Sequence, residues 1–441
     1  MNNNRIAQDV AAVTLPAPKE PILAQPQQIE LEKAALRLLA SDPVQSAIAS
    51  VKELYANDPI GKTHSGRATL GRYAENLAYQ AALYAADFDT VNPFILWSTN
   101  AGHSWHGINV PTSGYGLDSP DNIYRHATFD GAARYEIRGS IEGEGPAQQT
   151  FVIYTSIPGV TQTMNADGHM MEVAGIKSET LVREADGSFV VTMDADPANG
   201  RTNHMQVPAD NNSLHLMIRD SLADWTKQRP VRLSIERIDA APDQAGRSET
   251  EKAAHAAQIL QSYAPYWANW VRSYLGGKPI NEVVEPWMRQ TGWGMTQQGR
   301  FCLGADEAWV ITLNPLDAQY FNIQISDPWA KAVQYVNRTG SFNQNQADVC
   351  KDGTITLVAS PQDPGVFNWL DTAGLSEGTF QARWQSLPDS VTSGKDAVVS
   401  VKVVKMGELG AHLPEGTRRV SAQERALQQE LRAASYANRL C

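Results

Sequence analysis

Residues 355–383 read ITLVASPQDPGVFNWLDTAGLSEGTFQAR, and residues 191–219 read VTMDADPANGRTNHMQVPADNNSLHLMIR. Each stretch starts with an alternating strand pattern, passes through a turn with proline and glycine, and ends in a second strand that closes on an arginine. Chance similarity between hairpins is the alternative explanation. We interpret the stretches as diverged copies of one unit, which predicts two β units and a shared cleft to which equivalent polar positions point. These positions are Asn203 and Asn368, after a one-residue shift, and Arg219 and Arg383.

Alternating patterns of apolar and polar residues continue on both sides of each copy. Turn signals such as Asp186-Gly187 and Asn199-Gly200 separate them, which is typical of antiparallel sheets. The first group contains YEIRG, QTFVIYTSI, HMMEVAGI, SFVVTMDA, SLHLMIRD and VRLSIERI, and the second contains EAWVITLN, QYFNIQIS, TITLVAS, TFQARW and AVVSVKVVK.

Apolar residues recur at three- and four-residue spacing elsewhere, which predicts helices at 27–56, 66–88, 249–277 and 421–440. The expected fold class is α+β and β-rich, with two antiparallel β-sandwich-like units, an N-terminal helical subdomain, a helical connector and a C-terminal helix. The expected segments are a flexible N-terminal arm at 1–26, the helical subdomain at 27–90, a first β domain with an aromatic and histidine-containing loop at 91–248, the connector at 249–295, a second β domain at 296–405 and a helical tail at 406–441.

The composition is that of a globular protein with an acidic surface. The 441 residues are 42% hydrophobic and 19% charged, with a formal net charge of -11. Neither nucleic acid nor an anionic membrane is therefore an expected partner, and no stretch approaches the ~20 apolar residues of a membrane span. Cys302, Cys350 and Cys441 lack a zinc-binding spacing and indicate reduced thiols, which predicts a cytoplasmic protein. A homo-oligomer is an alternative to a monomer.

Motifs for the common cofactor chemistries are absent from the sequence. It contains no G-x-G-x-x-G after a strand, no G-x-x-x-x-G-K-[ST] and no G-x-S-x-G. We therefore expect no cofactor, and nucleotide-driven, hydride-transfer and serine-hydrolase reactions are not favoured.

An aromatic loop and the segment DSPDNIYRHATFDGAARYEIRG at 118–139 form one candidate site. If the segment is a strand, Tyr124 and His126 share a face, and such a pair suits deprotonation of a phenol or alcohol. His103 or His106 could act as the base instead, and the three imidazoles together could hold a metal, although no H-E-x-x-H spacing accompanies them. The alternative is that Tyr124 is a core residue and the histidines are neutral loop or surface residues. Candidate substrate-binding residues here are Trp97, Trp105 and Asn122.

The turn sequence DPGVFNWLDTAG offers a second group of polar and aromatic side chains. Trp369 could stack on an aromatic ligand while Asn368 orients a polar substituent, and Asp371 could instead cap a turn. Arg219 and Arg383 each end a strand, where they suit either an anionic ligand group or an ion pair with a nearby aspartate.

Three segments resemble the domain-of-unknown-function 1214 (DUF1214) family of bacterial proteins. They are DSPDNIYRHATFDGAARYEIRG, SLHLMIRDSLADWTKQRPVRLSIERI and YVNRTGSFNQNQADVCKDGTITLVASPQDPGVFNWLDTAG, and the resemblance spans about residues 90–405. The element DPGVxNWLDTxG is rather specific to that family, while DxPDNxY and RxxxxDW are moderately so. The resemblance implies a bacterial, β-rich cytosolic protein, often associated with catabolism of hydrophobic or aromatic compounds, and supplies no settled catalytic residues. We interpret Asp224-Trp225, within RxxxxDW, as architectural.

The expected function is that of a cofactor-independent acid and base enzyme, a lyase as first choice, acting on an aromatic or hydrophobic oxygenated small molecule. A histidine or tyrosine would remove a proton from a hydroxyl and an arginine would hold the developing oxyanion, while a C–C or C–O bond breaks, for example with loss of formaldehyde. The alternatives are a non-catalytic small-molecule or carbohydrate-binding protein, and a metalloenzyme that uses His103, His106 and His126.

Overall fold

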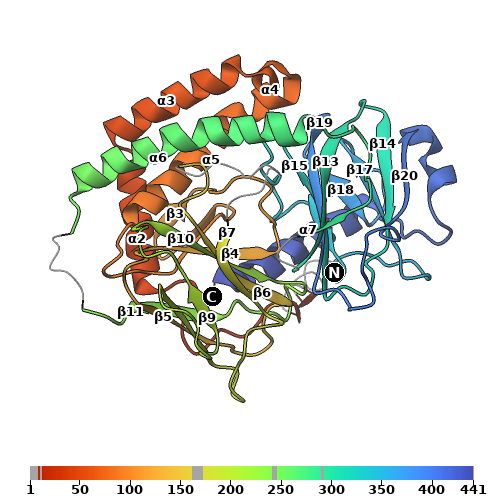
Figure 1. Cartoon of the computed structure of the whole chain (residues 1–441). Coiled ribbons are helices and arrows are strands. Elements are labelled where there is room, and N and C mark those ends of the chain that lie inside the picture. Colours follow the sequence, from red (N-terminus) through yellow and green to blue (C-terminus); the bar gives the residue numbers. More distant parts are fainter. Residues whose placement is uncertain (1–7, 10–11, 161–171, 241–245, 290–292, 441) are drawn as a thin grey trace.

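The chain folds into two β units and a group of helices, which Figure 1 shows in sequence colours. The computed structural model describes residues 8–9, 12–160, 172–240, 246–289 and 293–440. Parts of the predicted N-terminal arm and of the predicted strand HMMEVAGI, together with Cys441, lie outside these residues. The α+β, β-rich fold class with separate β units is confirmed.

The first β unit consists of a five-stranded sheet, with the order β1-β4-β10-β6-β7, and a four-stranded sheet, with the order β11-β5-β8-β9. Its strands are β1 (Leu96–Ser98), β4 (Asn122–Phe129), β5 (Tyr135–Ser140), β6 (Gln148–Tyr154), β7 (Glu172–Lys177), β8 (Phe189–Asp194), β9 (His204–Gln206), β10 (Leu214–Ser221) and β11 (Arg232–Arg237). A separate hairpin, β2 (His103–Trp105) and β3 (Ile108–Val110), follows β1.

The second β unit has the sheet orders β12-β13-β19-β15-β16 and β18-β17-β14-β20. Its strands are β12 (Trp287–Met288), β13 (Gly294–Cys302), β14 (Glu307–Leu313), β15 (Tyr320–Ser326), β16 (Ser341–Asn343), β17 (Ile355–Ser360), β18 (Trp369–Asp371), β19 (Glu377–Gln385) and β20 (Val398–Lys405). If the β2–β3 hairpin is left out, each unit has nine described strands that can be matched one to one in chain order. With this matching, the five-stranded sheets of the two units have the same strand order, and so do the four-stranded sheets. Each unit also has one parallel pair, β8–β9 or β17–β18, at the same place. This repeated topology supports the predicted internal duplication.

Asn368, which precedes β18, uses its side-chain amide to hold this strand in place. Its Nδ2 donates to the backbone oxygens of Asp348 (2.7 Å) and Thr356 (2.9 Å), and its Oδ1 accepts the N–H of Asp348 (2.7 Å). These backbone partners occupy the amide, so the structure assigns Asn368 to the frame of the sheet.

Asn203, which precedes β9, makes the same three contacts in the first unit. Its Nδ2 donates to the backbone oxygens of Val182 (2.7 Å) and Val190 (3.1 Å), and its Oδ1 accepts the N–H of Val182 (2.9 Å). The two asparagines are therefore equivalent, as the sequence comparison predicts. In both units these contacts hold the adjoining strand in place, whereas the sequence comparison predicts contact with a ligand.

The variant Asn368→Ala is expected to lower the free energy of unfolding by about 2 kcal/mol, because it leaves three backbone groups without their partner. Chemical denaturation measures this change. Asn212→Ala, on an exposed turn residue, is the control, and its expected change is within about 0.5 kcal/mol. Equal stability of the two variants would contradict the assignment.

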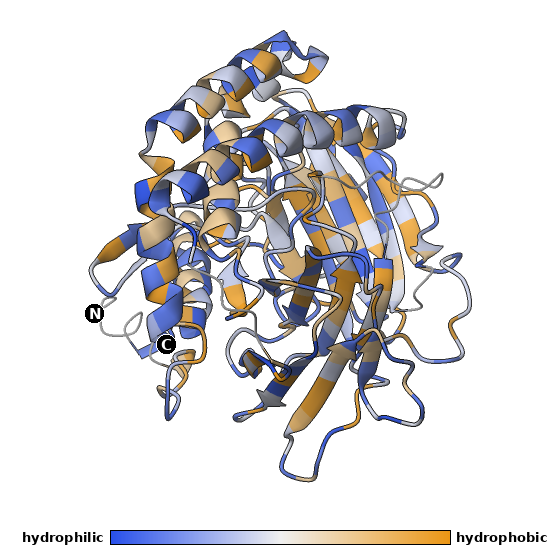
Figure 2. Ribbon diagram, turned by 60° about the vertical axis from the view of Figure 1, so that its left-hand side comes forward, coloured by the Kyte–Doolittle hydropathy of each residue, from blue (hydrophilic) through white to orange (hydrophobic). Residues whose placement is uncertain are grey.

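Helices cover one side of the molecule, as both ribbon views show (Figures 1 and 2). The N-terminal helices are α2 (Pro26–Leu39), α3 (Asp42–Asn57), α4 (Pro59–Lys62) and α5 (His64–Ala86), and the connector is α6 (Glu249–Trp270), continued by the π-helical turn η1 (Val271–Leu275). After β20 come η2 (Met406–His412), α7 (Ala422–Ala437) and η3 (Asn438–Leu440). Ser248 and Glu251 form a capping box that starts α6, so the predicted connector helix begins where local chemistry favours it.

The described residues form three large apolar cores and a fourth, smaller one that includes Val310, Val404 and Leu409. Each sandwich encloses its own core, represented by Phe151 and Ile218 in the first unit and by Trp309 and Phe380 in the second. The third core lies between the helices and the outer face of the first five-stranded sheet, and Tyr154 belongs to it.

The outer face of the second five-stranded sheet is buried although it is polar. Asn322, Gln324, Asn343 and Thr296 on this face are all fully buried. Figure 2 shows the corresponding alternation of hydrophilic and hydrophobic residues along the strands. Because buried polar groups need partners, this face must pair with another part of the chain, and it does so with the segment before β4.

Among the described helices, none is both long enough and apolar enough to cross a membrane.

Candidate functional site

A cavity of about 160 Å³ lies where the outer faces of the two five-stranded sheets meet the helical connector. Strands β4 and β10 contribute from the first unit, β13 and β19 contribute from the second, and α6 with η1 forms a further wall. Seven of the described lining residues are aromatic: Tyr115, Tyr124, Tyr274, Trp267, Trp270, Trp287 and Trp293.

Arg219, on β10, reaches the cavity from the first unit. Its Nη2 donates to the hydroxyl of Tyr154 at 3.2 Å, and its guanidinium carbon lies 5.9 Å from the ring centre of Tyr124 and 5.7 Å from that of Trp293. Its Nη1 is buried without a hydrogen-bond partner among the described residues. Burial by itself lowers the pKa of Arg219, but the nearby Tyr154 and Tyr124 raise it by more. The net pKa therefore lies above its ordinary value, and the guanidinium stays charged.

Arg383, at the equivalent place on β19, is held differently. Its Nη1 donates to the side-chain oxygens of Asn322 (3.2 Å) and Gln324 (2.7 Å), and its Nη2 donates to the backbone oxygen of Leu117 (2.5 Å) and to Gln381. Both terminal nitrogens are therefore used within the fold. The duplicated arginines have diverged into one that supports the cavity wall and one with a donor that has no partner among the described residues.

Arg289 and Trp293 form the rim next to β12 and β13. The guanidinium carbon of Arg289 lies 3.9 Å from the ring centre of Trp293, and its Nε has no partner among the described residues. Burial, then the charges of Arg383 and Arg219, lower the pKa of Arg289 to about 9.

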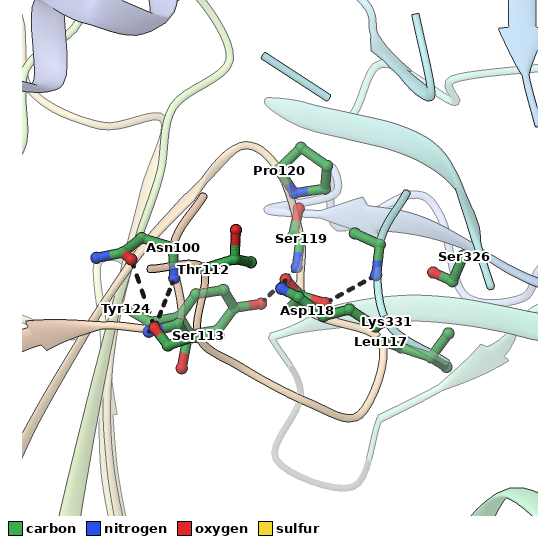
Figure 3. A network of polar contacts seen from close by, with 12 residues as sticks. Asn100, Thr112, Ser113, Leu117, Asp118, Ser119, Pro120, Tyr124, Ser326 and Lys331 are labelled. Carbon is green, nitrogen blue, oxygen red and sulfur yellow. Dashed lines mark hydrogen bonds and ion pairs between the residues drawn. The ribbon is translucent and has the colours of Figure 1, made fainter. Parts of the chain in front are cut away.

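Tyr124 is fixed by the segment that precedes β4, as Figure 3 shows. Its hydroxyl accepts the backbone N–H of Ser119 at 2.9 Å. Asp118 forms a buried ion pair with Lys331 of the second unit, which ties the segment to that unit. Tyr124 thus lines the cavity while its hydroxyl is held by a segment that is tied to the second unit.

Gly116, in the same segment, lies directly against Trp267 of α6. Its φ is +55°, and an added Cβ would meet the indole ring at 2.5 Å. The glycine therefore allows both the left-handed backbone and the close approach of the aromatic wall.

His126 shares a face of β4 with Tyr124, as the strand alternation predicts, but it does not line the cavity. Its Nδ1 lies 3.0 Å from Nε2 of His215, and the edge of Tyr84 covers both rings. Burial, with His215 and Arg219, holds the pKa of His126 well below its ordinary value. The structure thus places His126 in a buried pair with His215 and not in the cavity lining beside Tyr124, and it also differs from the alternative of a surface histidine.

His103 and His106 lie on the β2–β3 hairpin and its turn and are not among the described residues that line the cavity. The ring of His103 stacks on Trp97 at 5.0 Å, and Trp105 donates its indole N–H to Glu32 at 2.7 Å. This aromatic cluster belongs to the core between helices and sheet. Among the described residues, no group of three or more His, Cys, Asp or Glu side chains is placed to hold a metal, so the proposed set of three histidines does not form a common site.

Trp369 and Asp371 also have roles within the fold. Trp369 donates its indole N–H to the backbone oxygen of Ser360 at 3.0 Å, and Asp371 forms an ion pair with Arg338 at 2.8 Å and caps the turn at Ala373. Both lie on β18 of the outer four-stranded sheet. The contacts of Trp369 and Asp371 therefore stabilise this sheet, and no residue of the DPGVFNWLDTAG sequence is among the described residues that line the cavity between the two units.

Of the residues singled out in the sequence, the cavity brings together Asn122, Tyr124, Arg219 and Arg383. Sequence reasoning missed the connector aromatics Trp267, Trp270 and Tyr274 as well as Arg289 and Trp293. The spacing of three and four residues between the connector aromatics was a usable signal, since it places them along one face of a helix.

Comparison with known proteins adds a family and a fold. Residues 124–220 match the family described as "Protein of unknown function (DUF1214)". This part of the chain is a DUF1214 region. It runs from Tyr124 on β4 to Asp220 on β10 and so includes both Tyr124 and Arg219, whereas Arg289, Trp293 and Arg383 lie outside it.

A solved structure of an uncharacterized protein from Burkholderia cenocepacia is similar to the chain beyond the DUF1214 region. Its TM-score is 0.65 at 23% sequence identity, covering 85% of this chain and 99% of that one, which shows a shared fold. The VPA0106 protein from Vibrio parahaemolyticus matches with a TM-score of 0.38 and 13% identity, over 66% of this chain and 90% of that one. A comparison with curated proteins gave no match.

Proposed function

We propose that the protein is an acid and base enzyme that acts on an aromatic or hydrophobic oxygenated small molecule in the cavity between the two β units. The observation that carries the proposal is that the phenol Tyr124 and the guanidinium of Arg219, whose Nη1 has no partner among the described residues, line one cavity together with several aromatic side chains. The free thiols Cys302 and Cys350 support the further proposal that the protein works in the cytoplasm.

A lyase is the reaction class that we propose first. In one version, the Tyr124 oxygen acts as the base that takes the proton from a hydroxymethyl group of the substrate. The C–C bond then breaks, formaldehyde leaves, and the electron pair stays on the ring-side carbon, which regains a proton. Arg219 would stabilise the negative charge that develops, and no electron acceptor is needed.

The size of the cavity supports a small substrate. Its volume of about 160 Å³ compares with the ~150 Å³ of a protein cavity that accommodates a benzene ring. One six-membered ring with short substituents therefore fits, and larger polycyclic compounds are not proposed.

The proposal predicts formaldehyde release when chelator-treated protein is incubated with monocyclic hydroxymethyl aromatic compounds. Tyr124→Phe is expected to lower kcat about a hundredfold while ligand affinity changes little, because the lost hydroxyl takes part in proton transfer. Tyr79→Phe is the matched control, since its buried hydroxyl has no partner among the described residues and does not line the cavity. The proposal would be contradicted if turnover required added metal or nicotinamide, or if Tyr124→Phe kept full activity.

A non-catalytic binding protein is the second candidate, and one observation favours it. Asp118 is the one carboxylate among the described lining residues, it is paired with Lys331, and no histidine is among them. A binding protein would bind aromatic ligands through the same arginine and aromatic residues, and no compound in the assay series would be turned over by either wild type or Tyr124→Phe.

A further inference from the structure

We infer that the ligand of the cavity is an aromatic carboxylate whose anionic group binds at Arg219, Arg289 and the indole N–H of Trp293. This deepens the proposed function by naming a substrate class. It rests on the proposed cavity and does not depend on the proposed lyase reaction.

The first argument is an excess of unused donors in the wall. Among the described lining residues, Nη1 of Arg219, Nε of Arg289 and the indole nitrogens of Trp293 and Trp267 are buried without a partner. Trp293 is 6% exposed and Trp267 is 3% exposed, so the solvent cannot readily satisfy them. Since unpaired buried donors are costly, a ligand with strong acceptors is the expected partner.

The second argument is charge. Arg219, Arg289 and Arg383 all line the cavity, and no ion pair joins any of them to a carboxylate within the described part of the chain. Glu172, at the start of β7, and Tyr154 raise the pKa of Arg289, yet burial and the other two arginines outweigh them. A cavity with concentrated positive charge and low exposure favours an anion.

The third argument places the anionic group at one end. The guanidinium carbons of Arg219 and Arg289 lie 5.7 and 3.9 Å from the ring centre of Trp293. The terminal nitrogens of Arg383, in contrast, donate hydrogen bonds to four oxygens within the protein. The two arginines with free donors therefore meet at Trp293. A planar carboxylate matches the fork of a guanidinium, and a small carboxylate suits the limited volume better than a phosphate ester.

The remaining groups fit the aromatic part of such a ligand. Trp267, Trp270 and Tyr274 supply ring faces and edges along the connector. Oδ1 of Asn122 and Oε1 of Gln298 are buried acceptors without a partner among the described residues. They suit a hydroxyl substituent, in line with an oxygenated aromatic substrate.

The test compares benzoate with benzamide, which has nearly the same shape but no charge, by calorimetric titration of the full chain. Wild type is expected to bind benzoate at least about tenfold more tightly, because hydrogen bonds to charged groups contribute about 1.5 to 3 kcal/mol. Arg289→Met and Arg219→Met should each weaken benzoate binding about tenfold or more and change benzamide binding little. Arg67→Met, an exposed arginine of α5, is the control and should leave both affinities unchanged.

Three outcomes would overturn the inference. They are equal binding of benzoate and benzamide by wild type, unchanged benzoate affinity in both arginine variants, and binding of phenyl phosphate at least as tight as that of benzoate. Arg219→Lys, which keeps the charge and loses the fork, separates folding from recognition: intermediate benzoate affinity supports the inference. Tight benzoate binding without turnover of any alcohol would reject the proposed lyase reaction and support the aromatic carboxylate as ligand. Turnover of neutral alcohols without a preference for benzoate would support the lyase reaction and reject the aromatic carboxylate.

Discussion

Replacement of Asp121 by alanine is expected to lower the free energy of unfolding by about 3 to 5 kcal/mol, because one buried carboxylate joins three parts of the chain. Its Oδ2 accepts from the amide of Asn322 (2.6 Å) and the hydroxyl of Tyr320 (2.9 Å) on β15. Its Oδ1 accepts from the indole of Trp225 (2.8 Å) and the amide of Asn343 (3.0 Å) on β16. The variant would leave these four donors buried, three of them on the polar face of the second unit and one on Trp225 of the first unit.

Charge adds to the expected cost of losing Asp121. Burial raises the pKa of Asp121, while Arg439 and Arg432, near the C-terminal end of α7, lower it. Removing the carboxylate therefore also removes a counter-charge for two buried guanidinium groups.

Chemical denaturation at neutral pH measures the effect of Asp121→Ala. Asp210→Ala, at an exposed aspartate in the turn before β10, is the matched control and should change stability by less than about 0.5 kcal/mol. Asp121→Asn retains the shape but places an amide opposite donors, so it should also be destabilised. Stability of both Asp121 variants near that of the control would show that the units do not depend on this carboxylate.

The period of the hydrophobic pattern predicts the sheets and helices because each sandwich buries one face of its strands in its own core. The strand QYFNIQIS illustrates where this reasoning ends. Its polar positions Asn322 and Gln324 would ordinarily face solvent, yet they are fully buried against the segment before β4. A pattern of alternation cannot show that a polar face is covered by a distant part of the chain. The pairing of Trp225 with Asp121, in contrast, agrees with the architectural interpretation of Asp224-Trp225.

The candidate site was predictable where the duplication marked Arg219 and Arg383 and where segment 118–139 marked Asn122 and Tyr124. Arg219 and Arg383 align in the two copies and both reach the cavity, while Asn203 and Asn368 align after a one-residue shift and serve the frame of their sheets. Sequence comparison identifies equivalent positions, but the face of the strand decides what each position contacts. Trp293 meets Arg219 only through tertiary packing, and no local pattern carries that information.

Stability is expected to fall steeply below pH ~6.5 because His126 and His215 are buried as a neutral pair. Both are 1% exposed, and burial followed by the charge of Arg219 lowers the pKa of His215 to about 3. Burial, His215 and Arg219 lower the pKa of His126 as well. In the unfolded chain both pKa values return to ~6.5, so the unfolded state binds more protons in the acid range and gains stability as the pH decreases.

The size of this effect follows from the proton balance. Each histidine is expected to cost ~1.4 kcal/mol per pH unit below ~6.5, which amounts to about 4 kcal/mol for the pair between pH 7 and pH 5. Urea unfolding at several pH values measures the slope. In the double variant His126→Asn/His215→Asn, the two amides can still bond to each other and neither titrates. Its loss of stability between pH 7 and pH 5 should be about 4 kcal/mol smaller than that of wild type, even if its stability at pH 7 is lower. His64→Asn, at an exposed histidine of α5, is the control and should keep the wild-type dependence of stability on pH. If the double variant also kept the wild-type dependence, the buried pair would take up protons without unfolding the core.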